Sequence, residues 1–378
     1  MKKKLLVILA VSLTPILSLS VVAFAAGGEV AEKEVDLAQD TGQAWLERIA
    51  ALTGEPLEWI EARLTAPQVY CDLKGQPNAY MFAMEKEGKV VGHVLVGSSS
   101  YGYPVFEAGD AAPVSIPSPD KVKSILERDL GLKVEEIGEP TRLLYLGFGH
   151  LFAIYKVDQQ EVAVNQIFEF ATPASNLKAA MPSPEDYKAA KKATREAKPE
   201  LLGSSGYNSL LMYYYCESRR CYCGPASGVS IGRYYRDHCG YDDLPSPNSY
   251  MYDRLRFEMG VPTTPGNYGP AFISMTEDCP SHYNNFSYVN DWIVTGGDYW
   301  NRVADIDNGW PIALESPHFY YPDAPTPPHW IAIRGYQYPR GEIQHAIRCT
   351  DSYTQQSSLW VDWDHIGWQP LFTVTIKD

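Results

Sequence analysis

The spacing of apolar residues predicts helices at the start of the chain and strands after them. Apolar residues recur on one helical face over residues 41–64, and Gly54 divides that stretch, which predicts two short helices with Thr41 as the first N-cap. The period then changes to two in the largely apolar segments 79–84 and 89–96, which are separated by the short turn 85–88. This pattern is typical of a β-hairpin.

One more helix and several strands are expected before the pattern breaks. Ser118 followed by Pro119 is typical of a helix N-terminus, because proline is tolerated in the first turn. Apolar segments that predict strands follow it, around 143–146, 151–157 and 162–170. Residues 27–171 are therefore expected to form a small α+β domain. No His, Cys and acidic cluster in it suggests chemistry, so its default roles are to bind, shield or help fold another part.

Residues 172–206 have a different composition. They combine several prolines, the charged run 188–200 and the segment Gly203–Gly206, which is typical of a linker with one exposed helix and offers a processing site. Beyond it, residues 207–378 are rich in Tyr, Trp and Cys. We expect this region to be the second domain and to hold the chemistry.

Length and charge narrow the function classes. The chain has 378 residues, of which 45% are hydrophobic and 21% charged, which suits two globular domains. Its 32 Lys and Arg against 46 Asp and Glu give a formal net charge of −14. Such a balance disfavours nucleic acid or an anionic membrane as the main ligand.

The N-terminus predicts export. Lys2, Lys3 and Lys4 precede an apolar run over residues 5–22, and Ala23-Phe24-Ala25 then provides the small-x-small pattern of a signal-peptidase site. Residues 1–25 are therefore predicted to be a signal peptide. No later run has the roughly 18 consecutive apolar residues that a membrane span needs. We expect the mature protein to be secreted and extracellular, with no membrane attachment after signal removal.

Cys223 is the candidate nucleophile. It precedes Gly224 and Pro225, a turn followed by a helix start, and apolar residues continue the helix after it. A cysteine at a helix N-terminus faces the positive end of the macrodipole, which favours the thiolate over the thiol. A buried or disulfide-bonded cysteine is the ordinary alternative in a secreted protein.

A thiolate nucleophile needs a base and a residue that orients the base. His329 follows a proline-rich loop and opens an apolar strand, so it is the preferred base, with His318 as the second choice. Asp351 ends the next candidate strand, which is expected to run antiparallel to the His329 strand and to bring the two side chains together. Asp362 and Asp364 are alternatives, each also expected as a solvated surface residue.

These segments resemble a known family. Cys-Gly-Pro-Ala-Ser at 223–227, His-Trp-Ile-Ala-Ile-Arg-Gly-Tyr at 329–336 and Thr-Asp-Ser-Tyr at 350–353 are similar to the C39-like branch of papain-like cysteine peptidases, and the resemblance covers 207–378. It implies an α+β, papain-like domain in which the helix carrying the Cys packs on an antiparallel sheet carrying the His and Asp. The matching positions are Cys223 as nucleophile, His329 as general base and acid, and Asp351 as its orienting residue.

One position departs from the family pattern. The family has a Gln six or seven residues before the Cys as oxyanion donor, whereas this chain has Glu217 and Cys216 there. A carboxylate does not donate to an oxyanion, so the Cys223 backbone N–H is one expected donor and the side-chain donor is left open. The side chains considered as substitutes are Tyr215, Ser218 and Asn208.

The remaining cysteines predict a disulfide rather than a metal site. Cys216 and Cys221 are close enough in sequence to form a disulfide that closes the loop before Cys223, and export favours disulfides. A zinc site built from these two, Cys223 and His238 is the alternative, although the spacing lacks the paired Cys-x-x-Cys pattern of structural zinc. We expect no metal and no organic cofactor.

The expected function is a secreted cysteine peptidase that cleaves peptide bonds through a Cys-His-Asp triad and a thioester acyl-enzyme. Its substrate would be a peptide or protein, and the N-terminal domain would be propeptide-like and a possible intramolecular inhibitor. Two alternatives stay open. One is a catalytically impaired papain-like binding module, and the other is a transglutaminase-like acyl transferase, which uses the same order of Cys, His and Asp.

Overall fold

The computed structural model describes most of the chain between residue 32 and the C-terminus. The described residues are 32–54, 57–178, 181–198, 206–216, 222–260, 263–277, 285–293, 298–316, 329–338, 345–351, 355–366 and 371–378. The predicted signal peptide, residues 1–25, lies outside these ranges. Among the described residues, no helix has both the length and the apolar character that crossing a membrane requires.

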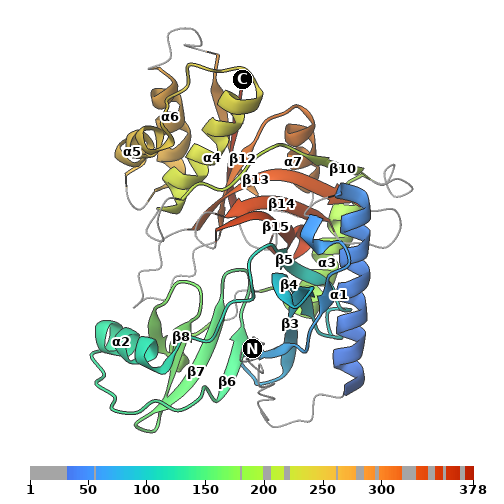
Figure 1. Ribbon diagram of the computed structural model, residues 1–378, viewed down its shortest axis with the longest axis vertical. Helices are drawn as coiled ribbons and strands as arrows, with labels where there is room; N and C mark the ends of the chain where they lie inside the picture. The colour runs from blue at the N-terminus through green and yellow to red at the C-terminus, as the bar shows by residue number, and fades with distance from the viewer. Residues whose placement is uncertain are drawn as a thin grey trace, which may run out of the picture.

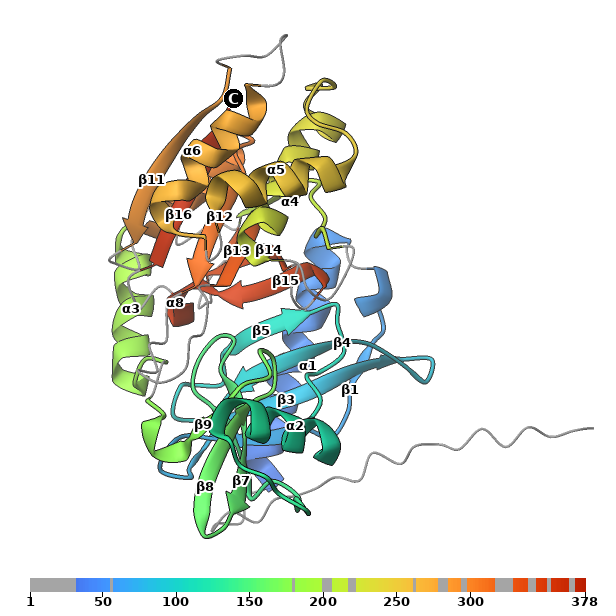
Figure 2. The same cartoon turned by 90° about the vertical axis from the view of Figure 1, so that its left-hand side faces the viewer.

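The strands of both halves belong to one sheet, shown from two sides in Figures 1 and 2. The N-terminal half contributes β1 (Arg63–Leu64), β2 (Gln68–Cys71), β3 (Pro77–Lys86), β4 (Lys89–Gly97), β5 (Val105–Gly109), β6 (Arg142–Tyr145), β7 (Leu151–Val157), β8 (Gln160–Asn165) and β9 (Ala171–Pro173). The C-terminal half contributes β10 (Gly206–Ser209), β11 (Ser287–Ile293), β12 (Ile312–Ser316), β13 (His329–Tyr338), β14 (Ala346–Asp351), β15 (Gln356–Asp362) and β16 (Leu371–Lys377).

Helices cover this sheet. They are α1 (Glu32–Thr53), α2 (Pro119–Leu130), α3 (Pro184–Glu196), α4 (Cys223–His238), α5 (Asn248–Met259), α6 (Pro265–Thr276), α7 (Tyr299–Asp307) and α8 (Trp363–Ile366), with short 3-10 turns at Leu57–Trp59 and Ala174–Asn176. In Figure 1, α4, α5 and α6 lie at the top, α2 lies at the bottom and α1 runs along one side. The described strand pairs are antiparallel except β2 with β6, so the fold is α+β.

Two local predictions in the N-terminal half are confirmed and one is wrong. β3 and β4 form the predicted hairpin, and α2 begins at Pro119 with the Ser118 side chain accepting from the N–H of Lys121. Instead of starting at Thr41, however, α1 starts at Glu32 and is one helix of 22 residues up to Thr53. Where the second helix was expected, the structure has only a 3-10 turn at Leu57–Trp59 and the strand β1. The Thr41 hydroxyl donates to the carbonyl of Leu37 one turn earlier, so Thr41 is an interior helix residue and not a cap.

The last predicted strand of this half is divided. β8 ends at Asn165, and β9 begins only at Ala171. Between them, the Asn165 side-chain oxygen accepts from the N–H groups of Ile167 and Phe168, at 2.9 and 2.7 Å. This side-chain turn replaces the continuous strand, because Asn offers the backbone a local partner instead of a neighbouring strand.

The segment predicted as a linker carries a packed helix. α3 begins after Ser183, whose hydroxyl accepts from the N–H of Asp186 as an N-cap. Its Tyr187 and Thr194 are 1% and 0% exposed, so one face of the helix is buried and the expectation of an exposed helix is wrong for that face. Residues 199–205 lie outside the described ranges, and β10 then joins the sheet beside β13.

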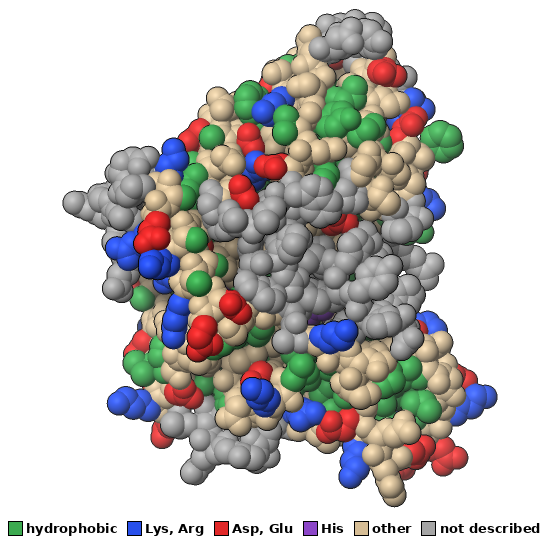
Figure 3. Space-filling view, turned by 180° about the vertical axis from the view of Figure 1, so that it is seen from behind, with side chains coloured by type: hydrophobic (Ala, Val, Ile, Leu, Met, Phe, Trp, Pro, Cys, Tyr) green, Lys and Arg blue, Asp and Glu red, His purple; other side chains and the backbone are tan. Residues whose placement is uncertain are grey.

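The two halves meet edge to edge in the sheet. β15 pairs with β5, with Leu359 opposite Gly109 and Val361 opposite Glu107. One apolar cluster crosses this junction, because Trp45 of α1 packs with Trp360 of β15 at a ring-centroid distance of 6.3 Å. The surface is mixed in charge: on the face in Figure 3, acidic and basic side chains are interspersed.

Candidate active site

Cys223 is the first residue of α4, as its sequence context predicted. Tyr222 before it is extended, at φ −72° and ψ 129°, and Pro225 occupies the first turn, where its missing N–H has no helical partner to lose. The Tyr222 N–H donates to the hydroxyl of Tyr252 on α5 at 2.8 Å, which anchors the chain as it enters the helix. The half-buried Cys223 thiol therefore sits at the positive end of the α4 dipole.

Close packing joins the start of α4 to the start of β13. At Gly224, a Cβ would overlap the side chain of Thr263, so only glycine allows this approach. The Thr263 carbonyl accepts from the indole N–H of Trp330 at 3.3 Å, and the Trp330 ring stacks on Tyr268 of α6 with centroids 4.7 Å apart. Since Trp330 follows His329 in β13, this packing holds the histidine strand against the cysteine helix.

His329 and Asp351 form an ion pair where β13 begins and β14 ends. β13 and β14 are antiparallel, with Ala332 opposite Thr350, which brings the first residue of β13 beside the last residue of β14. His329 Nε2 lies 3.1 Å from Asp351 Oδ1, and the two residues are 9% and 3% exposed. Because Nε2 faces the carboxylate, Nδ1 is the ring nitrogen left to face Cys223.

The electrostatics favour a charged imidazole. Burial disfavours the charged form, but attraction to Asp351 and hydrogen bonds with the side chains of Asp351 and Cys223 outweigh it and raise the pKa of His329 to about 10. His329 is therefore an imidazolium at neutral pH, next to both a carboxylate and a thiol. Such a group can stabilise a thiolate and later donate a proton.

Two residues of the N-terminal half also reach this site, and sequence analysis missed both. The ring of Phe168 lies 5.5 Å from the His329 ring, at an interplanar angle of 64°. His150 is 4% exposed, and burial together with the nearby charge of His329 lowers its pKa to about 3. The available signals were local: a Gly-Phe-Gly turn before His150 and the Asn165 turn before Phe168.

The structure excludes one of the three side chains considered as oxyanion donors. The Asn208 amide donates to Asp307 at 3.1 Å, and Asn208 pairs with Tyr336, far along β13 from His329. Asn208 is therefore ruled out, because seven residues of strand span about 23 Å. Tyr215 is buried, with its ring 5.8 Å from that of Tyr252. Glu217 and Ser218 lie outside the described residues, and helix geometry directs the Cys223 N–H out of the end of α4.

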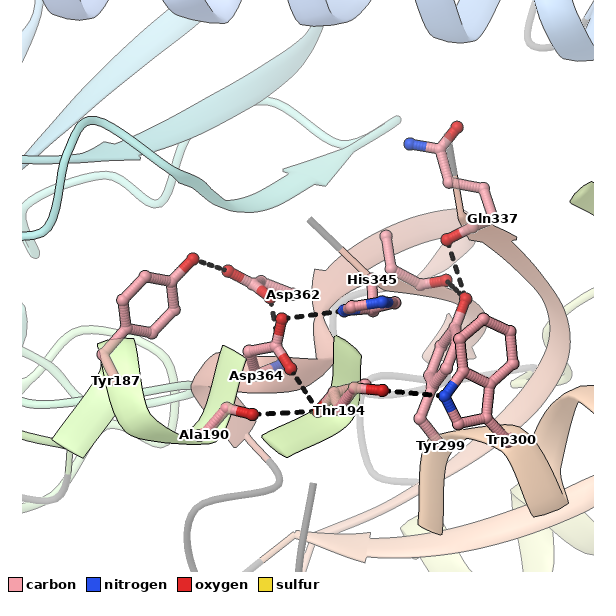
Figure 4. Close-up of polar contacts among 10 residues, drawn as sticks. Tyr187, Ala190, Thr194, Tyr299, Trp300, Gln337, His345, Asp362 and Asp364 are labelled. Atoms are coloured by element: carbon pink, nitrogen blue, oxygen red, sulfur yellow. Dashed lines mark hydrogen bonds and ion pairs between the residues drawn. The ribbon is translucent and has the colours of Figure 1, made fainter. Parts of the chain in front are cut away.

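Asp362 and Asp364, the alternative orienting residues, belong to a different cluster (Figure 4). Both are 0% exposed, so the surface expectation is wrong. The Tyr187 hydroxyl donates to Asp362 Oδ2 at 2.8 Å, the Thr194 hydroxyl donates to Asp364 Oδ1 at 2.6 Å, and His345 Nδ1 lies 3.0 Å from Asp364 Oδ2. Burial and the neighbouring Asp364 charge raise the pKa of Asp362 well above its usual range. This cluster fastens α3 to the end of β15 and to α8.

The cysteines do not form the alternative zinc site. Cys216 is disulfide-bonded, and its predicted partner Cys221 lies outside the described residues, as does His318. Cys223 and His238 are the two ends of α4 and lie about 22 Å apart, too far to share a metal. Over the described ranges, no group of three or more His, Cys, Asp or Glu side chains is placed to hold a metal ion.

Comparison with known proteins adds no family to this geometry. No protein-family model matches the chain, and no curated protein matches it.

Proposed function

We propose that this protein is a secreted cysteine peptidase of the papain-like type. One geometric observation carries the proposal. Cys223, at a helix N-terminus, is hydrogen-bonded to the buried His329, whose Nε2 lies 3.1 Å from Oδ1 of the buried Asp351. This arrangement supports the roles of nucleophile, base and orienting residue in thiol acyl transfer. The resemblance of residues 207–378 to C39-like peptidases supports the same proposal.

The proposed reaction has two steps. The Cys223 thiolate attacks the peptide carbonyl carbon, and the carbonyl electron pair moves onto oxygen. When the C–N bond breaks, His329 gives its proton to the leaving amine, and a thioester remains on Cys223. Neutral His329 then takes a proton from water, whose oxygen attacks the thioester carbon. The C–S bond breaks, the acid product leaves, and the thiolate–imidazolium pair is restored.

Asp351 supports both steps. Its carboxylate holds Nε2, so the ring keeps Nδ1 toward Cys223 and carries its positive charge at low cost in a buried site. The start of α4 supplies a backbone N–H for the developing oxyanion.

The test combines a thiol probe with turnover. Purified protein is treated with a substoichiometric amount of iodoacetamide and mapped by mass spectrometry, and casein hydrolysis is measured in parallel. We expect alkylation at Cys223 first, and loss of both signals in Cys223→Ala. Cys239→Ala is the matched control, because Cys239 is an exposed free thiol just beyond the other end of α4. Equal hydrolysis by the wild type and Cys223→Ala would contradict the proposal.

The same assay separates the alternatives. Adding an amine such as cadaverine distinguishes hydrolysis from acyl transfer, since a transferase would incorporate the amine into casein faster than it releases peptides. Alkylation at Cys223 without turnover would instead indicate a binding module.

A further inference from the structure

The N-terminal half places an aromatic ring on the candidate base. Phe168 lies in the turn between β8 and β9, more than 150 residues before His329 in the chain, yet the two rings are 5.5 Å apart. In the same half, Phe148 packs against the apolar cluster of the C-terminal half, against which Cys223 also packs. Residues outside the proposed peptidase region therefore contribute to the surroundings of the triad.

The position of Phe168 is fixed by its own turn. Asn165 accepts from the Phe168 N–H at 2.7 Å, and its side-chain amide donates to the carbonyl of Gly149 at 3.4 Å, which ties this turn to the preceding one. Gly149 has φ +76°, and a Cβ there would lie 3.4 Å from the Phe168 ring. The backbone at Gly149 thus supports the ring of Phe168.

The N-terminal half is also joined firmly to the half that carries the triad. β5 continues the sheet at β15, as Figure 2 shows. At the same junction His365 of α8 stacks on Phe106 with centroids 4.1 Å apart and lies 2.8 Å from the Tyr145 hydroxyl. Because the two halves are joined in this way, the Phe168 ring keeps a fixed position relative to His329.

We propose that Phe168 is a positioning residue for His329, so that the N-terminal half completes the active site. This inference rests on the proposed peptidase function. The ring limits rotation of the imidazole and covers it against water, and an aromatic ring attracts a neighbouring cation. Water kept away from the His329–Asp351 pair leaves their attraction less screened.

His150 is compatible with this role. It is buried beside His329, and its lowered pKa keeps it neutral while His329 is charged. Through His150 and Phe168, the N-terminal half therefore presents a neutral imidazole and a phenyl ring to the imidazolium, and neither competes in charge with Asp351.

The test uses the full chain and three variants at one position. In Phe168→Ala we expect kcat on casein-derived peptides to fall about tenfold with KM changed less than twofold, because orientation and not substrate binding is lost. Phe168→Tyr should restore kcat, whereas Phe168→Leu, which keeps the bulk, should restore it only in part. Phe170→Ala is the matched control, since Phe170 follows in the same turn and packs on Phe152 instead.

A spectroscopic measurement separates this inference from the proposed function. The Nε2–H proton of His329, bonded to Asp351, should give a far-downfield NMR signal whose exchange with water is several-fold faster in Phe168→Ala than in the wild type. That measurement needs no turnover, so it holds even if the protein is not a peptidase. Unchanged kcat and unchanged exchange would overturn the positioning role. A rise in kcat/KM would overturn it as well, and would identify the turn as an inhibitor of the site.

Discussion

His329 keeps its charge in a buried place because Asp351 lies beside it. Burial would lower the pKa of the imidazole, and the carboxylate at 3.1 Å together with the Cys223 hydrogen bond reverses that effect. The pair therefore sets the upper limit of the pH range over which the buried imidazole is charged.

Asp351→Asn should lower the upper limit of the pH range over which His329 is charged. Without the carboxylate, the pKa of His329 falls from about 10 toward or below its usual value of 6.5, because burial is then the dominant effect. We expect the alkaline limb of kcat/KM against pH to move down by two units or more, and activity at pH 8 to be largely lost. A limb that stays in place would show that Asp351 does not set the histidine charge.

The same ion pair makes stability depend on pH with a definite sign. A group whose pKa is raised by folding stabilises the fold fully below its unfolded pKa, here about 6.5, and this contribution disappears as the pH rises through about 10. The free energy of unfolding of the wild type should fall by a few kcal/mol between these values.

Urea unfolding at pH 6 and pH 10 measures this change, with Asp351→Asn as the reference for every other group that titrates. The difference in unfolding free energy between wild type and variant should shrink at the higher pH. A difference that is constant or grows with pH would contradict a raised histidine pKa.

Helix α4 and strand β13 place the thiol beside the imidazole by packing at their first residues. Thr263 touches both elements: its side chain fills the space at Gly224, and its carbonyl accepts from Trp330. The distance between Cys223 and His329 therefore depends on the close packing that Gly224 allows.

Gly224→Ala should separate the two elements. The added methyl group overlaps the Thr263 side chain, so we expect a loss of about 1–3 kcal/mol in the free energy of unfolding and a loss of Cys223 alkylation selectivity. Gly266→Ala is the control, because a Cβ at Gly266, in the first turn of α6, meets nothing within 4 Å. If both alanine variants behave alike, close packing at Gly224 does not position the thiol.

Some elements could be predicted from the sequence because their signals lie among neighbouring residues, whereas others have ambiguous local patterns. The hairpin of β3 and β4 and the Ser118 helix start follow from alternation and capping, which involve neighbours in sequence. The start of α1 was missed because Thr41 suits both a cap and a helix interior, and the hydroxyl bonds inside the helix. The turn at Asn165 was missed because the apolar residues around it resemble a strand.

The two halves behave as one body in the described structure. The sheet runs through the β5–β15 junction, and α3 is fastened to β15 and α8 by hydrogen bonds from Tyr187 and Thr194 to two buried carboxylates. Each of these bonds satisfies a polar group that would otherwise be buried without compensation, so separating the halves is unfavourable.

Cleavage between the halves should therefore leave them associated. A recognition sequence for a site-specific protease, inserted after Gly203, allows the purified chain to be cut. We expect both fragments to elute together in gel filtration under native conditions, to keep Cys223 reactivity, and to separate only in concentrated guanidinium chloride. Separation in plain buffer would support the removable propeptide that the sequence suggested.

The order of Cys223, His329 and Asp351, the helix start at Cys223 and the antiparallel partner strand of the His329 strand all follow from the amino-acid sequence, because each depends on capping, turns or periodicity among near neighbours. The phenyl ring beside His329, the buried carboxylates that bond to α3 and the shared sheet depend on contacts between residues roughly 160 to 250 positions apart. Such contacts have no local pattern, since they form only where whole elements pack. Tertiary structure therefore decided that the N-terminal half is part of the site's surroundings, a role that composition and spacing left open.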